Sequence, residues 1–210
     1  MTPARTSSST DVPRLGLRER KKIKTRTAIR TATYSLIKEQ GYDATTIEQI
    51  AERAEVSPST VFRYFPTKED IVLTDEYDAA LLEEIRKRPA DEPWMETLRY
   101  VMRKAIGIGL GEEEIEVTRL RSHLLVQVPA VHSRMLESMS VTGRMLGEAI
   151  AERTGRPQDS FEVRVFTMSL IGALSEITLY WAENDFQDDL RELLDRALDV
   201  VERGLPAKNA

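Results

Sequence analysis

The chain of 210 residues contains no cysteine and only two histidines, His123 and His132. The lack of cysteine excludes disulfides, thiolate metal sites and a cysteine nucleophile, and it is typical of proteins from a reducing cytoplasm. Two histidines give little scope for an imidazole metal site or for general-base catalysis. Because the sequence also has no phosphate-binding loop and no paired-carboxylate motif, we expect a protein that is not an enzyme and has no metal or cofactor.

Long apolar runs and strand patterns are scarce as well. Residues 1–11 are rich in Ser and Thr and lack the apolar segment of a signal peptide. We find no apolar run that approaches the ~20 residues needed to span a bilayer, so we expect a soluble, cytoplasmic protein with no membrane partner. No alternating run of β-branched residues is closed by a hairpin turn, and the apolar residues have helical spacing. The sequence therefore predicts an all-α fold.

Charge is distributed unevenly along the chain, whose formal net charge is −5. Residues 1–68 hold 13 Lys/Arg and 7 Asp/Glu, a net charge of +6, whereas residues 69–210 hold 17 and 28, a net charge of −11. Since phosphate attracts basic segments and repels acidic ones, this asymmetry favours a basic, nucleic-acid-binding head on an acidic body. Chance segregation of charge is the alternative.

Glycine, proline and capping residues divide the chain into about nine predicted helices. We expect a disordered arm over residues 1–17, a small three-helix domain over residues 18–67, and a larger helical domain over residues 68–210. The predicted helices cover approximately residues 18–40, 46–54, 58–65, 68–88, 94–110, 112–127, 130–154, 158–183 and 187–203.

The two short helices between residues 45 and 65 have the pattern of a helix-turn-helix. Either Thr45 or Thr46 can cap the first of them, and Thr45 and Glu48 have the spacing of a capping box. Ser57 is placed to cap the second helix, with Pro58 at its first position, where a missing N–H costs nothing. The second helix of such a motif enters the major groove of DNA, so we expect this one to read sequence.

The expected reading helix has a polar face, and no acidic residue occurs between Val56 and Lys68. We expect Arg63 to donate hydrogen bonds to a guanine edge, and the hydroxyl groups nearby to bond bases or phosphates. The residues expected to contact DNA are Lys22, Arg26, Thr45, Thr46, Pro58, Ser59, Thr60, Phe62, Arg63, Tyr64 and Lys68. The alternative is that each polar residue is an ordinary exposed side chain and that the two aromatic residues belong to the core.

The segment from Thr27 to Val72 carries a specific pattern of residues. It comprises Gly41-Tyr42, Thr45-Thr46-Ile47, Ile50-Ala51, Val56-Ser57 and the run Phe62-Arg63-Tyr64-Phe65-Pro66-x-Lys68-Glu69. In these residues the chain resembles the TetR family of bacterial transcriptional regulators. One departure is Glu55, because the family often has glycine in that turn, where a positive φ is easy.

The resemblance implies a homodimer whose two heads read DNA half-sites roughly 34 Å apart. In the family, the last two long helices usually form the dimer interface. The residues expected there are Val165, Met168, Gly172, Leu179, Leu190, Leu194, Ala197 and Val201. The alternative is that these apolar stripes face only the core of the monomer.

The resemblance also implies a small-molecule effector that binds among the helices of the larger domain. Methionine and aromatic side chains adapt well to apolar ligands. The residues expected to line the site are Trp94, Met102, Ile106, Leu120, His123, Leu124, Gln127, Met135, Met139, Phe166, Tyr180 and Trp181. The alternative for each of them is a place in the ordinary core.

Taken together, the resemblance implies a sequence-specific DNA-binding transcriptional regulator. We expect a repressor that a small-molecule effector releases from its operator by a shift of conformational population. The alternatives are a ligand-responsive activator and a helical interaction module that does not bind DNA.

Overall fold

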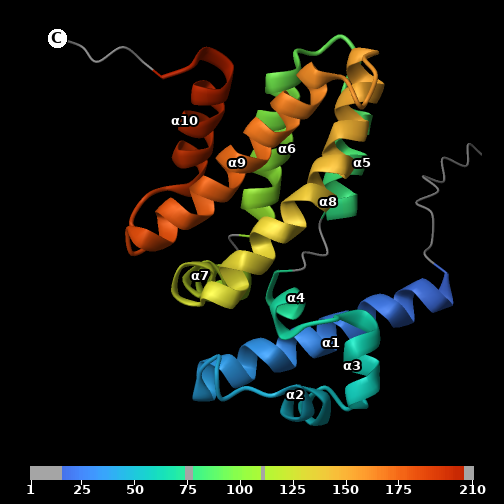
Figure 1. Cartoon of the computed structure of the whole chain (residues 1–210), viewed down its shortest axis with the longest axis vertical. Helices are drawn as coiled ribbons and strands as arrows, with labels where there is room; N and C mark the ends of the chain where they lie inside the picture. The colour runs from blue at the N-terminus through green and yellow to red at the C-terminus, as the bar shows by residue number, and fades with distance from the viewer. Residues whose placement is uncertain (1–15, 74–77, 110–111, 206–210) are drawn as a thin grey trace, which may run out of the picture. The chain divides into compact units, whose positions relative to one another are not determined.

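The computed structural model describes residues 16–73, 78–109 and 112–205, which contain ten helices and no strand (Figure 1). The all-α prediction is therefore confirmed for the described part of the chain. The helices are α1 (Leu17–Gln40), α2 (Ile47–Arg53), α3 (Pro58–Tyr64), α4 (Lys68–Leu73), α5 (Asp78–Lys87), α6 (Trp94–Gly109), α7 (Glu112–Gln127), α8 (Pro129–Thr154), α9 (Phe161–Glu183) and α10 (Leu190–Arg203).

The predicted helix over residues 68–88 contains two described helices, α4 and α5. The other predicted helices match observed ones to within a few residues at each end. Most of the predicted disordered arm, residues 1–15, lies outside the described residues. The chain divides into two compact units between Tyr64 and Phe65, close to the expected boundary at residues 67 and 68. The expected limits of the domains themselves stay a prediction.

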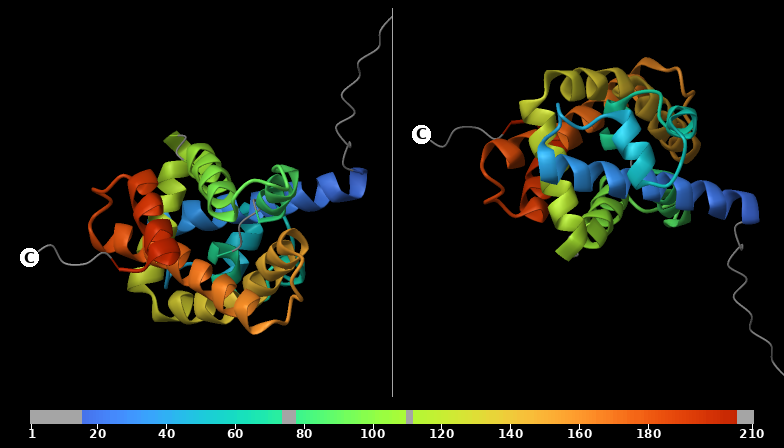
Figure 2. Two further views of the ribbon diagram at one scale, coloured as in Figure 1. Left: turned by 90° about the horizontal axis from the view of Figure 1, so that it is seen from above. Right: turned by 90° about the horizontal axis from the view of Figure 1, so that it is seen from below.

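The first unit contains α1, α2 and α3, and α2 packs against both α1 and α3 (Figures 1 and 2). Each helix contributes one fully buried branched side chain: Ile29 from α1, Ile50 from α2 and Val61 from α3. The N-terminal turns of α1 extend past α3, and the cations there are mostly exposed (Figures 1 and 2). This unit thus combines a small core with a projecting basic helix end.

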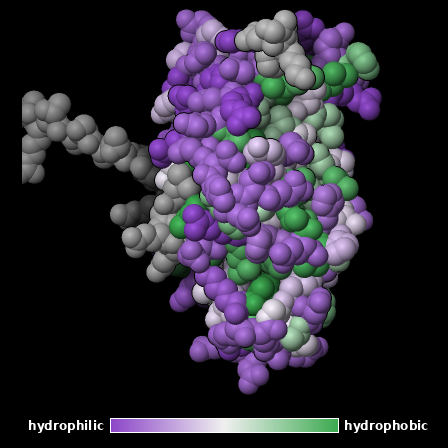
Figure 3. Space-filling model, turned by 90° about the vertical axis from the view of Figure 1, so that its left-hand side faces the viewer, coloured by the Kyte–Doolittle hydropathy of each residue, from purple (hydrophilic) through white to green (hydrophobic). Residues whose placement is uncertain are grey.

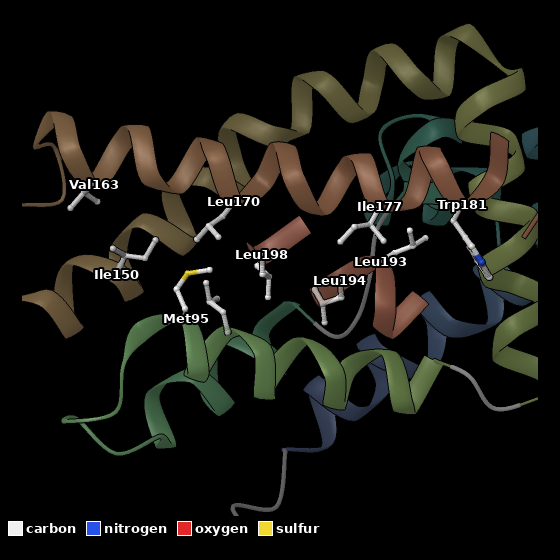
Figure 4. Close-up of a cluster of buried hydrophobic side chains, with 10 residues drawn as sticks. Met95, Ile150, Val163, Leu170, Ile177, Trp181, Leu193, Leu194 and Leu198 are labelled. Atoms are coloured by element: carbon white, nitrogen blue, oxygen red, sulfur yellow. The ribbon is translucent and has the colours of Figure 1, made fainter. Parts of the chain in front are cut away.

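The second unit is a bundle whose main core lies between α6, α8, α9 and α10. Figure 4 shows the side chains of α9 directed across this core toward residues of the other three helices. The buried residues of this core are Met95, Leu98, Ile150, Val163, Leu170, Ile177, Trp181, Leu193, Leu194 and Leu198. Burial of this apolar surface is the main driving force for folding of the unit.

Helices α8 and α9 run side by side and approach closely at two glycines of α8 (Figure 1). A Cβ atom at Gly143 would lie 3.3 Å from Ile171 Cδ1 and 3.4 Å from Met168 Sδ. A Cβ atom at Gly147 would lie 3.6 Å from Thr167 Oγ1. The missing side chains therefore let α9 lie directly against the backbone of α8.

Helix α9 overturns one expectation from the sequence, namely that no apolar run approaches membrane-spanning length. Among the described helices, α9 is long and apolar enough to cross a membrane, by length and composition alone. Glu176 is the only charged residue between Val165 and Ala182, and a search for uninterrupted apolar runs stops there. Core helices of water-soluble proteins meet the same two criteria, and α9 packs against α7, α8 and α10.

An ion-pair network joins α6 to α10. The guanidinium of Arg99 on α6 is only 14% exposed, and it bonds the carboxylates of Asp195, Asp199 and Glu202 on α10. It also donates to the main-chain oxygen of Asp195, at 3.2 Å. Arg103, one turn further along α6, pairs with Asp195 alone and is 53% exposed.

We predict that Arg99→Ala lowers the free energy of unfolding by about 2 kcal/mol. The substitution leaves three carboxylates without their shared cation, and the cost is moderated because these carboxylates are partly solvated. Urea-induced unfolding, followed by circular dichroism, measures the change. Arg103→Ala is the matched control, because it removes the same charge from an exposed position and should leave stability nearly unchanged. Equal losses in the two variants would contradict a special role for Arg99.

Candidate nucleic-acid interface

The start of α2 is fixed by a capping box at Thr46, one of the two threonines expected to cap it. The Thr46 hydroxyl oxygen accepts from the Gln49 N–H at 3.2 Å, and Gln49 Oε1 accepts from the Thr46 N–H at 2.9 Å. The predicted pairing of Thr45 with Glu48 is therefore wrong. Thr45 is instead 1% exposed and donates its hydroxyl to the oxygen of Gly41 at 2.8 Å. Because Thr45 is buried, its side chain cannot contact DNA in this structure.

Two side-chain links hold α2 against α1. Gln40 donates to Gln49 Oε1 at 2.9 Å, and Arg53 bonds both Ser35 Oγ, at 2.9 Å, and the Glu39 carboxylate. The hydrogen bond from Arg53, with a further contribution from Ser35, holds the pKa of Glu39 below its ordinary value. The same bond to Glu39 raises the pKa of Arg53. These contacts fix the position of α2 on α1.

The turn between α2 and α3 is tight and contains a residue in the left-handed region. Glu55 has a φ of 55°, which glycine adopts without strain and other residues rarely do. The next residue, Val56, donates its N–H to the oxygen of Ala51 at 2.9 Å. The positive φ at this turn explains why the family often has glycine there. In this chain a glutamate adopts the same backbone conformation.

The N-terminus of α3 carries a small network of hydroxyl groups. Ser57 Oγ accepts from the Thr60 N–H at 3.1 Å, which confirms Ser57 as the residue that caps α3. The Ser57 hydroxyl also lies 2.9 Å from the hydroxyls of Ser59 and Thr60. Each of these hydroxyls can exchange a bond within the network for one to a DNA base or phosphate.

The two faces of α3 differ sharply in exposure. Val61 is fully buried and anchors the helix, whereas Pro58, Ser59 and Arg63 are exposed. Phe62 is 52% exposed, which excludes the alternative that it is a core residue of this chain. The exposed residues thus form a single helix surface with polar and apolar parts, and a major groove is wide enough to admit a helix.

The cation expected to read a base is held by its neighbour in the chain. The Arg63 guanidinium lies over the ring of Tyr64, 5.3 Å from its centroid. Tyr64 itself is half-buried, so its ring gives Arg63 a fixed support. Of the remaining expected contacts, Thr46 and Lys22 are exposed, while Thr60, Arg26 and Lys68 are half-buried.

The residues expected to bind an effector fall into three groups in the second unit. Four of them, Trp94, Met102, Ile106 and Phe166, are partly buried and pack against the main core. Leu120, His123, Met135 and Met139 are half-buried on α7 and α8, and Leu124 is buried. Gln127 and Tyr180 are exposed, so a ligand enclosed within the bundle would not contact them as they lie here.

Trp181 belongs to the core rather than to a ligand surface. It is 3% exposed, and its indole N–H donates to the oxygen of Asp188 at 2.9 Å. Its ring meets that of Phe186 edge-on, with the centroids 4.7 Å apart, and Phe186 also contacts His123. These contacts hold the connection between α9 and α10, where Asp185 and Phe186 have positive φ angles.

The residues expected at a dimer interface differ in exposure between α9 and α10. On α9, Val165 and Met168 are 48% and 46% exposed, and a Cβ atom at Gly172 would meet nothing within 4 Å. Leu179 is half-buried. On α10 the expectation is wrong for Leu194, which is 1% exposed and lies in the monomer core. Leu190, Ala197 and Val201 pack against that same core, because it occupies the apolar face of α10.

The sequence does not indicate several buried polar groups of the second unit. The hydroxyls of Ser122 and Thr167 and the indole N–H of Trp94 are buried, with no hydrogen-bond partner among the described residues. No local pattern distinguishes such residues, because their isolation depends on tertiary packing. The sequence also does not predict a pocket lined by Arg86, Arg88 and Arg153. The basic run over residues 86–88 indicates only a part of its lining.

Comparisons with known proteins agree with this geometry. Residues 29–74 match the family described as "Bacterial regulatory proteins, tetR family", and residues 92–206 match the family described as "MftR C-terminal domain". The HTH-type transcriptional regulator TcmR of Streptomyces glaucescens is 32% identical over 187 residues, which are 81% of this chain and 81% of that protein.

Solved structures show the same fold. The TetR-family repressor FadR of Thermus thermophilus, crystallised with lauroyl-CoA, is 26% identical, with a TM-score of 0.55 over 88% of this chain and 97% of that one. FadR of Bacillus subtilis, in complex with stearoyl-CoA, is 22% identical, with a TM-score of 0.58 over 86% and 99% of the two chains. The chain therefore belongs to the TetR family of bacterial transcriptional regulators.

Proposed function

We propose that α3 reads operator DNA in the major groove and that Arg63 makes the base contact. The observation that carries this proposal is the pairing of the fully buried Val61 with the exposed face of Pro58, Ser59 and Arg63. Phe62, with half of its surface exposed, supplies an apolar contact beside that face, such as one to a thymine methyl group. The protein performs this role in the bacterial cytoplasm, where its operator lies.

Phosphate contacts flank the reading helix in this proposal. Thr46 begins α2, and its O–H remains able to donate to a phosphate while its oxygen accepts from Gln49. Lys22 and Arg26 lie on the basic N-terminal half of α1, and Lys68 begins α4. Contacts of this kind set the register of a protein on DNA and make its affinity strongly dependent on salt.

We propose a homodimer in which the exposed face of α9 meets its counterpart. Val165 and Met168 expose apolar surface there, and Gly172 leaves room for a close approach. On the side of the molecule drawn in Figure 3, apolar residues come to the surface in patches bordered by polar ones. The outward residues of α10 are mostly charged, with Val200 the apolar exception at 41% exposure, so this helix contributes a polar border.

The proposed effector has an extended apolar part and is a candidate acyl-CoA thioester. The support is the likeness to the T. thermophilus repressor crystallised with lauroyl-CoA, together with the partly buried apolar side chains of Met102, Ile106 and Phe166. Such a ligand would gain affinity by removing its acyl chain from water. It acts by favouring a conformation of the dimer whose two heads no longer match consecutive major grooves.

A specific contact is available to carry this change toward the head. Arg134 of α8 donates to Asp70 Oδ1 at 2.8 Å, and Asp70 Oδ2 accepts from the Thr67 N–H at 3.1 Å. Asp70, followed by Glu137, raises the pKa of Arg134 well above its ordinary value, so this cation is permanent. Since α4 follows the reading helix directly in the chain, a movement of α8 is passed through Asp70 to the segment next to α3.

We predict that Arg63→Ala weakens binding to the operator by about 1–3 kcal/mol and relaxes sequence preference at one base pair. Fluorescence anisotropy with operator DNA and single-base variants measures both effects at a fixed salt concentration. Arg144→Ala removes an equal charge from an exposed position on α8 and serves as the control. A loss of equal size on every DNA sequence would place Arg63 on a phosphate, and no loss would refute its role.

We predict that Met168→Glu converts the dimer to monomers and reduces affinity for an operator with two half-sites. The symmetry of the interface brings the two introduced charges together, at a cost that apolar contacts do not offset. Sedimentation velocity measures the oligomeric state. Leu136→Glu, at a position on α8 that is 54% exposed, is the matched control and should remain dimeric. If Met168→Glu stays dimeric, the α9 face is not the interface.

We predict that lauroyl-CoA raises the melting temperature and releases the protein from DNA, whereas coenzyme A alone does neither. The difference isolates the acyl chain, which is the part that the apolar side chains of the bundle would bind. Thermal shift and DNA-binding anisotropy give the two measurements. If lauroyl-CoA has no effect at concentrations below its micelle threshold, the acyl-thioester proposal fails while the DNA-reading proposal stands.

A further inference from the structure

The second unit contains a pocket of about 230 Å³ between α5, the connection after it and the C-terminal half of α8. Its apolar lining comes from the exposed Ala90 and from Ile85 and Ala149, which are 3% and 2% exposed and belong to a small buried cluster. Its polar lining comes from three arginines and one glutamate: Arg86, Arg88, Arg153 and Glu152. The pocket thus combines an apolar base with a mainly cationic rim.

The arginines of this rim are held in place by different partners. Arg88 is neutralised by Glu92, to which it donates through Nε at 2.9 Å and through a second nitrogen. The hydrogen bonds from Arg88 and then from Thr97 lower the pKa of Glu92 to about 2, so Glu92 is ionised at neutral pH. The Arg88 guanidinium also lies 4.0 Å from the centroid of the Tyr100 ring. Arg88 therefore lines the pocket, but its positive charge is balanced by Glu92.

Among the described residues, no carboxylate lies at ion-pair distance from the guanidinium of Arg153. It donates to the main-chain oxygens of Arg88, Pro89 and Glu92, with a distance of 2.9 Å to the last. These bonds fix the connection between α5 and α6 but do not neutralise the cation. Its guanidinium also lies 5.8 Å from the centroid of the Trp94 ring.

Arg86 is restrained only weakly. Its Nε donates to Glu152 Oε2 at 3.3 Å, which joins α5 to α8 across the pocket, and both side chains are largely exposed, at 47% and 60%. An exposed pair of this length contributes little to stability, so Glu152 can be displaced by a better acceptor. Once Glu152 is displaced, the five N–H groups of the Arg86 guanidinium are available to bind a carboxylate or phosphate in a bidentate manner.

We propose that this pocket binds a small organic anion: a carboxylate or a phosphate monoester attached to a compact apolar group. The anionic group lies between Arg86 and Arg153 and takes the place of Glu152, while the apolar group rests on Ile85 and Ala149. The positive rim is unusual for its setting, because residues 69–210 hold 17 Lys/Arg against 28 Asp/Glu. Trp94 and Met102, which are expected to contact the effector, pack against the same small cluster, so this pocket adjoins the proposed effector site. The proposal does not depend on DNA binding.

Binding here would reinforce the contact of α5 with α8, which already includes the cluster of Ile85 and Ala149 and the bonds from Arg153 to the connection after α5. The anion would bridge Arg86 of α5 and Arg153 of α8, and Arg153 already carries the connection to α6. The ligand is thus expected to stabilise the folded protein in proportion to its concentration.

Isothermal titration calorimetry and thermal shift on the full chain test the proposal, with benzoate and phenyl phosphate as probes. Benzamide and benzamidine are the neutral and cationic controls of similar size. We expect saturable binding and a higher melting temperature with at least one anion, weaker binding at higher salt, and no response to either control. The two anions decide whether the site prefers a carboxylate or a phosphate.

Two substitutions at the exposed pair give opposite expectations. Arg86→Gln removes a ligand of the anion and should weaken binding about tenfold. Glu152→Gln removes the competing carboxylate and should tighten binding several-fold. Arg144→Gln, which removes an exposed cation elsewhere on α8, is the control and should leave affinity unchanged. The proposal is overturned if neither anion binds saturably, if benzamide binds equally well, or if the two substitutions change affinity in the same direction.

Discussion

The body of this protein is organised by α9, a helix that is apolar on most of its circumference. Its inner face supplies Val163, Leu170 and Ile177 to the core that α6, α8 and α10 share. Its outer face still exposes Val165 and Met168. A helix of this composition has to be covered on both sides, because exposed apolar surface in water is unfavourable. Within the described chain α9 packs against α7, α8 and α10, which leaves Val165 and Met168 exposed. In the proposed dimer, a second copy covers these two side chains.

The head follows a different constraint, namely that its reading helix must be both anchored and exposed. A seven-residue helix cannot be stable alone, so it depends on its cap and on the buried side chain of Val61. The cap comes from Ser57, and the position of α2 comes from its links to α1 through Gln49 and Arg53. The exposed residues of α3 are therefore presented on a scaffold that other residues hold.

Much of this organisation is predictable from the sequence, because helix limits depend on local chemistry. Gly41 ends α1 and Ser57 begins α3 as their residue types indicate. The sequence leaves Thr45 and Thr46 as alternative caps of α2, and the structure selects Thr46 because the hydroxyl of Thr45 is buried and bonds Gly41. The residues expected to contact DNA thus come from the sequence, with the buried Thr45 as the exception, and their contact with DNA stays a prediction.

The partners of each helix face are not predictable in the same way. The stripe of Leu194, Ala197 and Val201 on α10 shows that one face is covered, but a monomer core and a dimer interface require the same apolar pattern. The pocket beside Arg153 depends on residues about 65 positions apart in the chain, whose proximity is a property of the fold. Tertiary packing decides both questions.

The contact of α8 with α9 at Gly143 and Gly147 has a mechanical consequence. Side chains of α9 occupy the space that side chains at these two positions would take, so the two helices interlock there. A larger residue at Gly143 would have to displace α9, because the nearest atoms already lie at 3.3 and 3.4 Å from the Cβ position. Since Arg134 ties the N-terminal half of α8 to α4, α8 connects its contact with α9 to α4 within the second unit.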